Sequence, residues 1–252
     1  MNPLAVNKIA TALLLGGLCS NLALAACNDP PAPKVNWFGC DLSARDLSGA
    51  DLREAIFSNT TLHRTVLANA ILTGADFESA RAETTDFSNA QLGRARFTNA
   101  NLHKANFAGA NLDNARFNRA DLREASLQNT TGEKTSFYDA NMALVLLNNS
   151  TLLNANFEQA RLTGADFTKA TLIQARFSDA LLEKARFVGA HLQKSKLNTS
   201  NLSGADLSGA DLTQADLAGA QIPGAIFKDA ILANAAWVDR RRCKPASVGV
   251  CE

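Results

Sequence analysis

The sequence is short of several residue types: its 252 residues include only three His, one Tyr, two Trp and six Pro, and it has almost no net charge. The 25 basic residues against 24 acidic ones argue against a disordered acidic tail and against a dedicated nucleic-acid binder. No Ser/His/Asp set, phosphate-binding loop or zinc-ligand spacing is present. We therefore expect a protein that is not an enzyme and has no cofactor.

The first 26 residues have the organisation of a secretory signal peptide. The single charge of Lys8 precedes an apolar stretch from Ile9 to Leu18, and Ala23-Leu24-Ala25 is the small-x-small pattern of a cleavage site. About ten apolar residues are too few for a permanent membrane span. The alternative is a mature N-terminal helix. Removal of residues 1–26 would leave 24 basic and 24 acidic residues in a periplasmic or secreted chain.

Cysteine usage is consistent with an oxidising compartment. Cys19 would leave with the signal, so Cys27, Cys40, Cys243 and Cys251 remain, an even number that favours disulfides. A competing interpretation reads Leu24-Ala25-Ala26-Cys27 as a lipobox. Cys27 would then carry a lipid that anchors the protein to a membrane, and one of the three other thiols would be unpaired.

A repeat of five residues occupies positions 35–239. Its 41 centres, from position 37 to position 237, include 23 Leu and 12 Phe, and 29 of the 40 positions two residues before centres 42 to 237 are Ala. The residue just before the centre is often Asp or Asn, as in Ala50-Asp51-Leu52. A period of five fits neither a helix nor a strand. It predicts a chain that turns once per repeat, points one large and one small apolar side chain inward, and places small or polar turn residues outside.

The phenylalanines reveal how many repeats make one coil. All 12 Phe centres fall at positions ending in 7, and every such position spaced by 20 from Phe57 to Phe177 is Phe. Trp37 and Trp237 belong to the same column, and a second column contains Phe87 and its equivalents. Four repeats per coil would set these two Phe-rich columns opposite each other.

These A-(D/N)-L-x-x repeats resemble those of the pentapeptide-repeat family over about 205 residues. The resemblance implies an all-β fold, a single right-handed quadrilateral β-helix of about ten coils whose interior is filled by the centre residue and the small residue two before it. At about 4.8 Å per coil the rod would be about 48 Å long. The expected regions are a signal peptide at 1–26, an N-terminal cap at 27–40, the repeat β-helix at 35–239 and a C-terminal cap at 240–252.

Such a rod has two open ends, each of which exposes apolar core and needs a cap. We expect Trp37 and Trp237 to cap the core. A disulfide requires Cα atoms within about 7 Å, so cysteines at opposite ends of the rod cannot pair. This predicts the pairs Cys27–Cys40 and Cys243–Cys251. Neither pair is a C-x-x-C, so neither is expected to be redox-active.

The residues able to ligate a metal do not converge in this fold. His63 and His103 would share a column but lie two coils, about 10 Å, apart, and we read them and His191 as surface residues. Three acidic residues that could bind calcium fall on successive faces of the coil, so no metal site is expected. These acids are Asp206, Asp211 and Asp216.

Charge is unevenly distributed along the expected rod. Positions 41–90 hold eight acidic and four basic residues, 91–200 hold nine and fourteen, and 201–239 hold five and one. The basic middle contains a candidate binding strip that would attract anionic glycans, lipid headgroups or an acidic protein. The alternative is an ordinary solvated face. The basic strip consists of Arg94, Arg96, Arg116, Lys134, Arg176, Lys194 and Lys196.

A second candidate surface surrounds the irregular region from Thr130 to Leu153, where Gly132 replaces a core Leu. Four apolar residues there or one coil beyond occupy slots that are polar in other repeats, and we interpret them as a contact patch for a partner or a second copy. The alternative is a local bend or a packed bulge. The four residues are Leu144, Leu146, Leu153 and Ile173.

Together these features predict a structural or protein-interaction scaffold in the cell envelope, a monomer or weak homodimer with no membrane span after signal removal. Its partner would be an unidentified protein or envelope component rather than nucleic acid. One alternative is binding of anionic envelope components through the basic strip. The other is a DNA-mimic that protects topoisomerases, as family members with strongly acidic rods do, but the neutral charge and the signal peptide argue against it. The basic run Arg240-Arg241-Arg242 is expected to decorate the C-terminal cap.

Overall fold

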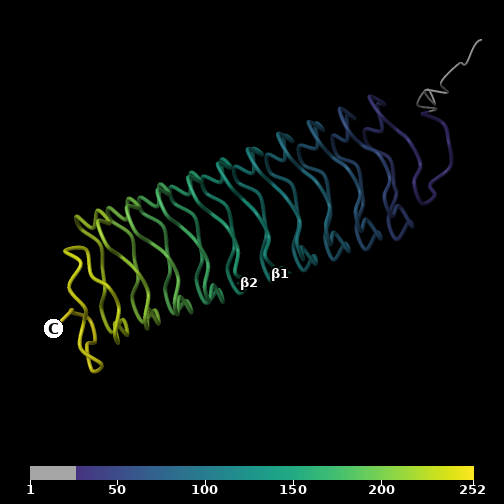
Figure 1. Cartoon of the computed structure of the whole chain (residues 1–252). Coiled ribbons are helices and arrows are strands. Elements are labelled where there is room, and N and C mark those ends of the chain that lie inside the picture. Colours follow the sequence, from purple (N-terminus) through teal and green to yellow (C-terminus); the bar gives the residue numbers. More distant parts are fainter. Residues whose placement is uncertain (1–26) are drawn as a thin grey trace, which may run out of the picture.

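The chain winds into one elongated rod of stacked coils (Figure 1), and this computed structural model describes residues 27–252. Parallel β-bridges join residues that are 20 positions apart, from Asn36↔Ile56 at one end to Asp216↔Ala236 at the other. Twenty residues per coil correspond to four repeats, which confirms the expected four-sided, all-β solenoid. The predicted signal peptide lies outside the described residues.

Each corner of a coil is a four-residue turn. In one of them the Ala55 N–H donates to the Leu52 carbonyl at 3.1 Å. The third residue of every turn has a positive φ, at each fifth position from Lys34 to Asn234. Gly and Asn suit this conformation, yet it is also imposed on Thr84 and Leu144, with φ of 57° and 59°. The stacking of the coils must therefore offset a local backbone cost at many corners.

The frequent Asp or Asn before each centre has a structural reason. Its Oδ1 accepts a hydrogen bond from the backbone N–H two residues later, as from Ser43 to Asp41 at 2.9 Å and from Ala218 to Asp216 at 3.0 Å. This side-chain bond satisfies a turn N–H that the ladder between neighbouring coils leaves aside. The preference for Asp or Asn directly before each centre is thus set by the turn rather than by core packing.

Phenylalanine rings fill the interior in two columns, as predicted. Within the long column, Phe77 and Phe97 stack with centroids 4.6 Å apart and planes 4° from parallel. Rings of the opposite column meet them edge to face, with Phe87 5.5 Å from Phe97 at 88°. All of these side chains are fully buried. Since stacked and edge-to-face arrangements are the favoured geometries of aromatic pairs, the two columns stabilise each other along the rod.

Pairing longer than a single bridge occurs at one place in the described chain, between the strands β1 (Thr131–Glu133) and β2 (Thr151–Leu153). They are parallel, with Gly132 opposite Leu152. A Cβ added at Gly132 would lie 2.5 Å from the Thr135 hydroxyl oxygen and 3.2 Å from the Leu152 side chain. The slot of the missing core leucine is therefore filled, and the irregular region contains a short parallel strand pair. The corner turns persist there, since Lys134 and Asn154 both have a φ of 56°.

Both expected cysteine pairs are at disulfide distance. Cys27 is bonded to Cys40 with Cα atoms 5.4 Å apart, and Cys243 is bonded to Cys251 with Cα atoms 4.8 Å apart. At the N-terminal end Trp37 is fully buried, with its ring 5.4 Å from that of Phe57. Trp37 thus lies inside this end of the core, and its capping role stays a prediction.

The C-terminal cap reverses the chain direction. It pairs antiparallel with the last coil, through Ile231↔Val248 and Ala236↔Arg242, and so covers two of the four sides. On the other two sides the core residues Ile222 and Phe227 remain partly exposed, and Trp237 is also only partly buried. Trp237 therefore lies partly exposed at this end of the core, and its capping role stays a prediction.

The stacked rings generate a stability prediction. Phe97→Ala removes a ring that contacts both columns, so the free energy of unfolding should fall by about 3–5 kcal/mol. Urea unfolding followed by circular dichroism measures this change. Phe227→Ala is the matched control, and it should cost clearly less because Phe227 is already partly exposed. Equal losses in the two variants would contradict the proposed role of ring stacking.

Candidate functional site

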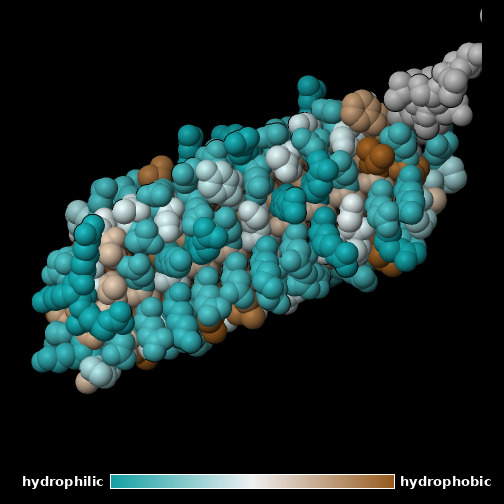
Figure 2. All heavy atoms as spheres, viewed as in Figure 1, coloured by the Kyte–Doolittle hydropathy of each residue, from teal (hydrophilic) through white to brown (hydrophobic). Residues whose placement is uncertain are grey.

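The basic strip lies along one edge of the rod. Three of its residues take the third turn position at the corner that leads into the long Phe column, and the other four directly precede the centre residues of that column. The surface is mostly hydrophilic on the side that Figure 2 shows, with scattered apolar residues. By position, the corner residues are Arg94, Lys134 and Lys194, and the residues before the centres are Arg96, Arg116, Arg176 and Lys196.

The first part of the basic strip lines a surface depression of about 640 Å³. Its walls are Arg94, Arg96, Asn114 and Arg116. Arg96 and Arg116 are bridge partners in adjacent coils, so two like charges stand directly above one another. Such pairs are unfavourable unless an anion or a carboxylate lies between or beside them. Arg96 has such carboxylates in this chain, so the charge that the depression offers to a ligand is that of Arg94 and Arg116.

Three members of the basic strip are already neutralised by acids of this chain. Arg96 pairs with Asp76 at 3.7 Å and makes a shorter contact with Glu78. In the other two pairs the nitrogen and oxygen atoms are 2.5 and 3.0 Å apart. These pairs are Arg176 with Glu158 and Lys134 with Glu133.

The remaining four members make no such pair. Within residues 27–252, no carboxylate lies within 4.0 Å of the charged groups of Arg94, Arg116, Lys194 or Lys196. The free positive charge is therefore concentrated at the two ends of the basic strip, and its middle is locally balanced.

The structure does not bring the four predicted apolar residues together. Leu144 is the third residue of the turn at one corner, Leu146 follows that turn, and they are 58% and 39% exposed. Leu153 and Ile173 lie two turns further round the coil, at the diagonally opposite corner, and are half-buried. The prediction of a single apolar patch is wrong, because residues seven to nine positions apart lie at different corners of a twenty-residue coil. Leu153 and Ile173 instead belong to the edge of the basic strip, between Lys134 and Lys194.

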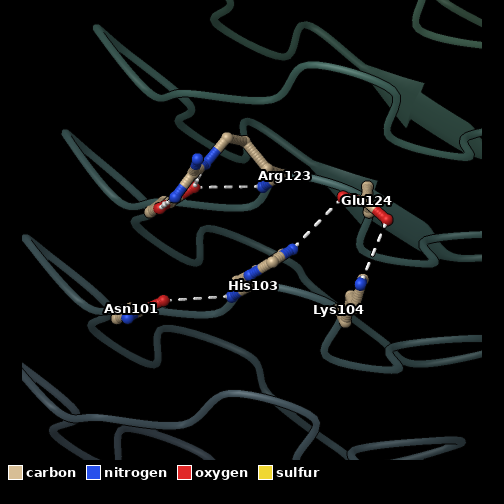
Figure 3. A network of polar contacts seen from close by, with 6 residues as sticks. Asn101, His103, Lys104, Arg123 and Glu124 are labelled. Carbon is tan, nitrogen blue, oxygen red and sulfur yellow. Dashed lines mark hydrogen bonds and ion pairs between the residues drawn. The ribbon is translucent and has the colours of Figure 1, made fainter.

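A separate polar network joins two coils at another corner (Figure 3). The Glu124 carboxylate is 3.3 Å from His103 Nε2 and 3.4 Å from Lys104 Nζ. The hydrogen bond with His103, helped by the charge of Lys104, lowers the pKa of Glu124. Arg123 Nε donates to Asp121 Oδ1 at 2.8 Å. The Glu124 contacts tie two neighbouring coils together, whereas the Arg123–Asp121 bond lies within one coil.

The histidines and aspartates that we considered as metal ligands lie at the surface and in turns. Among residues 27–252, no group of three or more His, Cys, Asp or Glu could hold a metal ion. Three acids are committed to their own turns, where each accepts a backbone N–H on a different side of the coil. They are Asp206, Asp211 and Asp216. The same part of the chain contains no helix that could cross a membrane.

Sequence reasoning missed the ion pairs of the basic strip, although a signal was present. Glu78–Arg96 and Glu158–Arg176 both join residues 18 positions apart. In a coil of 20 residues this spacing sets the residue after one centre beside the residue before the centre of the next coil. Acid-base pairs at a separation of 18 could have been sought once the coil length was known.

The turn carboxylates generate a prediction about pH. The hydrogen bond from the Ser43 hydroxyl, with that from the Ser43 N–H, lowers the pKa of Asp41 below its ordinary value of 3.8. Ser48 does the same for Asp46, and the Arg53 guanidinium for Asp51. Because the folded pKa lies below the unfolded one, this stabilisation is present at neutral pH and is lost as the pH falls below about 4.

Replacement of these three Asp residues by Asn keeps the oxygen acceptor but removes the titration. The melting temperature of the triple Asn variant should therefore fall less between pH 6 and pH 3 than that of the wild type. Thermal melts followed by circular dichroism measure this difference. The matching Ala variant lacks the acceptor and should be destabilised at neutral pH as well. Identical acid sensitivity of wild type and Asn variant would contradict the assignment. The three residues are Asp41, Asp46 and Asp51.

Comparison with known families agrees with this architecture. The profile described as "Pentapeptide repeat region" matches residues 33–107 and 150–227, and the profile "Pentapeptide repeats (8 copies)" matches 100–131 and 115–152. Together these matches span most of the repeat region. No curated protein matches the sequence.

Several solved structures are similar to this chain. HetL, a pentapeptide repeat protein involved in heterocyst differentiation regulation from the cyanobacterium Nostoc sp. strain PCC 7120, is 30% identical with a TM-score of 0.55, and the match covers 83% of this chain and 92% of HetL. A pentapeptide repeat protein from the Arabidopsis thaliana thylakoid lumen is 26% identical, with a TM-score of 0.24 and coverage of 52% and 68%. Full-length QnrB1, a plasmid-mediated fluoroquinolone resistance protein, is 15% identical, with a TM-score of 0.30 and coverage of 75% and 86%.

Proposed function

The chain belongs to the pentapeptide-repeat family, and from that premise we propose that it is a non-enzymatic scaffold, exported to the cell envelope, that binds partner proteins along its rod. The observation that carries this proposal is the contrast between interior and surface. The centre residues from Trp37 to Leu217 are almost completely buried, while charged and polar groups recur outside at a constant spacing. An interior filled in this way supports a shape that partners recognise rather than a reaction chamber.

The similarity to HetL is in keeping with an interaction role. HetL is described as taking part in the regulation of differentiation, and its match extends over most of both chains. Repeat proteins commonly present long regular surfaces to their partners. We propose that the present chain also acts by presenting its surface to partners, and we do not assign it the pathway of HetL.

Export is supported by the cysteines. All four cysteines of residues 27–252 are in disulfides, which form and persist in oxidising compartments. The proposed signal segment ends just before Cys27. A periplasmic or secreted location accounts for both features. The disulfide with Cys40 leaves the Cys27 thiol unavailable for lipid attachment.

Export and disulfide formation can be tested together on protein isolated from its native source. The mature chain should lack the signal segment, and alkylation without reduction should modify none of Cys27, Cys40, Cys243 and Cys251. Intact-mass spectrometry and peptide mapping measure both properties. A lipid on Cys27 with a free Cys40 thiol would instead establish membrane anchoring, and a retained N-terminus would rule out export through this signal.

The scaffold function itself predicts capture of specific proteins. The mature wild-type rod, immobilised and incubated with envelope extract, should retain a small set of proteins reproducibly. The matched control is the same protein unfolded by reduction and urea before immobilisation, which keeps the composition but loses the surface. Identification by mass spectrometry of equal sets on both supports, or of none, would contradict the proposal.

A second candidate function is the binding of anionic envelope components through the basic strip. The depression lined by Arg94 and Arg116 favours it, since neither side chain has an acidic partner. Co-sedimentation with envelope membranes and glycan fractions should fall when the four unpaired cations are changed to Glu, and unchanged binding would remove this candidate. The DNA-mimic alternative gains no support, because residues 27–252 contain 24 basic and 24 acidic residues.

A further inference from the structure

We propose that the basic strip docks an extended acidic segment of a partner protein, with one apolar side chain between its acidic ends. This inference rests on the proposed scaffold function and specifies the chemistry of the partner. It is carried by three observations on the same edge of the rod: unpaired cations at both ends, a neutral middle, and two apolar residues where other repeats have polar ones.

The charge pattern sets the ends of the docked segment. Arg94 and Arg116 form one cationic end, and Lys194 and Lys196 form the other. Asp216 is the bridge partner of Lys196 in the next coil, but the two charged groups make no ion pair. Between them Lys134 is paired with Glu133, so the middle offers little net charge. A ligand with acidic groups at its two ends and none between matches this distribution.

The apolar residues set the middle of the docked segment. Leu153 and Ile173 take the second turn position at the corner of the basic strip, on adjacent coils between Lys134 and Lys194. In the next coil Gln193 has the same slot, so nothing in the turn requires an apolar side chain there. Leu153 is the last residue of β2, opposite Glu133 of β1. Two neighbouring half-buried aliphatic side chains form a shallow seat for one apolar group.

The spacing then sets the length of the segment. Arg116 and Lys196 are four coils apart, which is about 19 Å at roughly 4.8 Å per coil. An extended chain rises about 3.3 Å per residue and points alternate side chains to the same side, so like-facing residues are about 6.6 Å apart. Three such steps span the distance from Arg116 to Lys196. The second step falls between Leu153 and Ile173, where the apolar side chain would lie.

This pattern favours a protein segment over a membrane or a glycan. Leu153 and Ile173 are half-buried and do not project, so they cannot insert into a bilayer, whereas an incoming side chain can reach them. A polyanionic glycan brings charge along its whole length and has no apolar group for the seat. The basic strip is also only two side chains wide, which suits a single extended chain.

The test uses two synthetic peptides of identical composition and the mature full-length protein. The matching peptide has glutamate at its first, third and ninth positions, leucine at its seventh, and serine elsewhere. In the permuted peptide the leucine moves by one position, which turns it to the other side of an extended chain. Fluorescence anisotropy at low ionic strength measures both affinities, and the matching peptide should bind about fivefold more tightly.

Variants of the protein identify the surface that binds. Arg116→Glu and Lys196→Glu should each weaken binding of the matching peptide about fivefold or more, and Ile173→Gln should abolish the preference over the permuted peptide. Arg186→Glu is the matched control, since Arg186 is an exposed residue at the same repeat position on the opposite side of the rod. It should leave binding unchanged. Circular dichroism melts confirm that all variants fold.

Three other outcomes overturn the inference, and a fourth overturns only the proposed function. Equal binding of the two peptides would show a general anion site without an apolar seat. Binding to phosphatidylglycerol vesicles that depends on Arg116 and Lys196, with no peptide binding, would assign the basic strip to membranes. If the scaffold captures envelope proteins and Arg116→Glu does not disturb their capture, this inference fails while the proposed function stands. If the rod captures no protein but binds the matching peptide selectively, the scaffold function fails and the docking chemistry stands.

Discussion

The parallel ladder that joins the residue before each repeat centre to the one twenty positions away is the constraint on which the rest of the structure depends. Its hydrogen bonds, such as Phe77 N–H to the Arg96 carbonyl at 2.7 Å, require four sides of equal length in every coil. A single inserted residue would turn all later side chains to wrong positions, which explains why 41 repeat centres follow without an interruption. The same ladder imposes a positive φ on Lys and Arg residues at the corners.

The register between neighbouring coils determines which surface side chains meet, just as it determines which side chains pack in the core. A side chain meets neighbours 18 and 20 positions away, so charges far apart in the sequence form pairs such as Arg176 with Glu158. Where the acid is missing, as beside Arg116, the same register leaves a positive charge without a partner. The pattern of unpaired surface charge is therefore set by the positions at which the chain lacks a local counter-ion, rather than by the total charge of the protein.

Periodic features could be predicted from the sequence, because the period alone sets them: the coil of four repeats, the opposed Phe columns and the segregation of cysteines at the two ends. Features that depend on a local departure from the period could not be predicted from the sequence. Gly132 gives no sign that Thr135 and Leu152 will fill its slot, and residues 240–252 carry no repeat from which a reversal could be read. The prediction that Leu144 and Leu153 share one patch is wrong, because nine positions place them at opposite corners of a twenty-residue coil. Export remains a prediction, since the signal peptide lies outside the described residues.

The reversed C-terminal segment has a consequence for the length of the assembly. Every coil is a template for another coil in the same direction, so an uncovered end would invite rods to join end to end into fibres. Pairing of Ile231 with Val248 and of Ala236 with Arg242 runs the opposite way, and the Cys243–Cys251 bond closes that segment into a loop. A second rod would find no parallel ladder to continue on these two sides. The cap therefore blocks end-to-end continuation of the parallel ladder on two of the four sides.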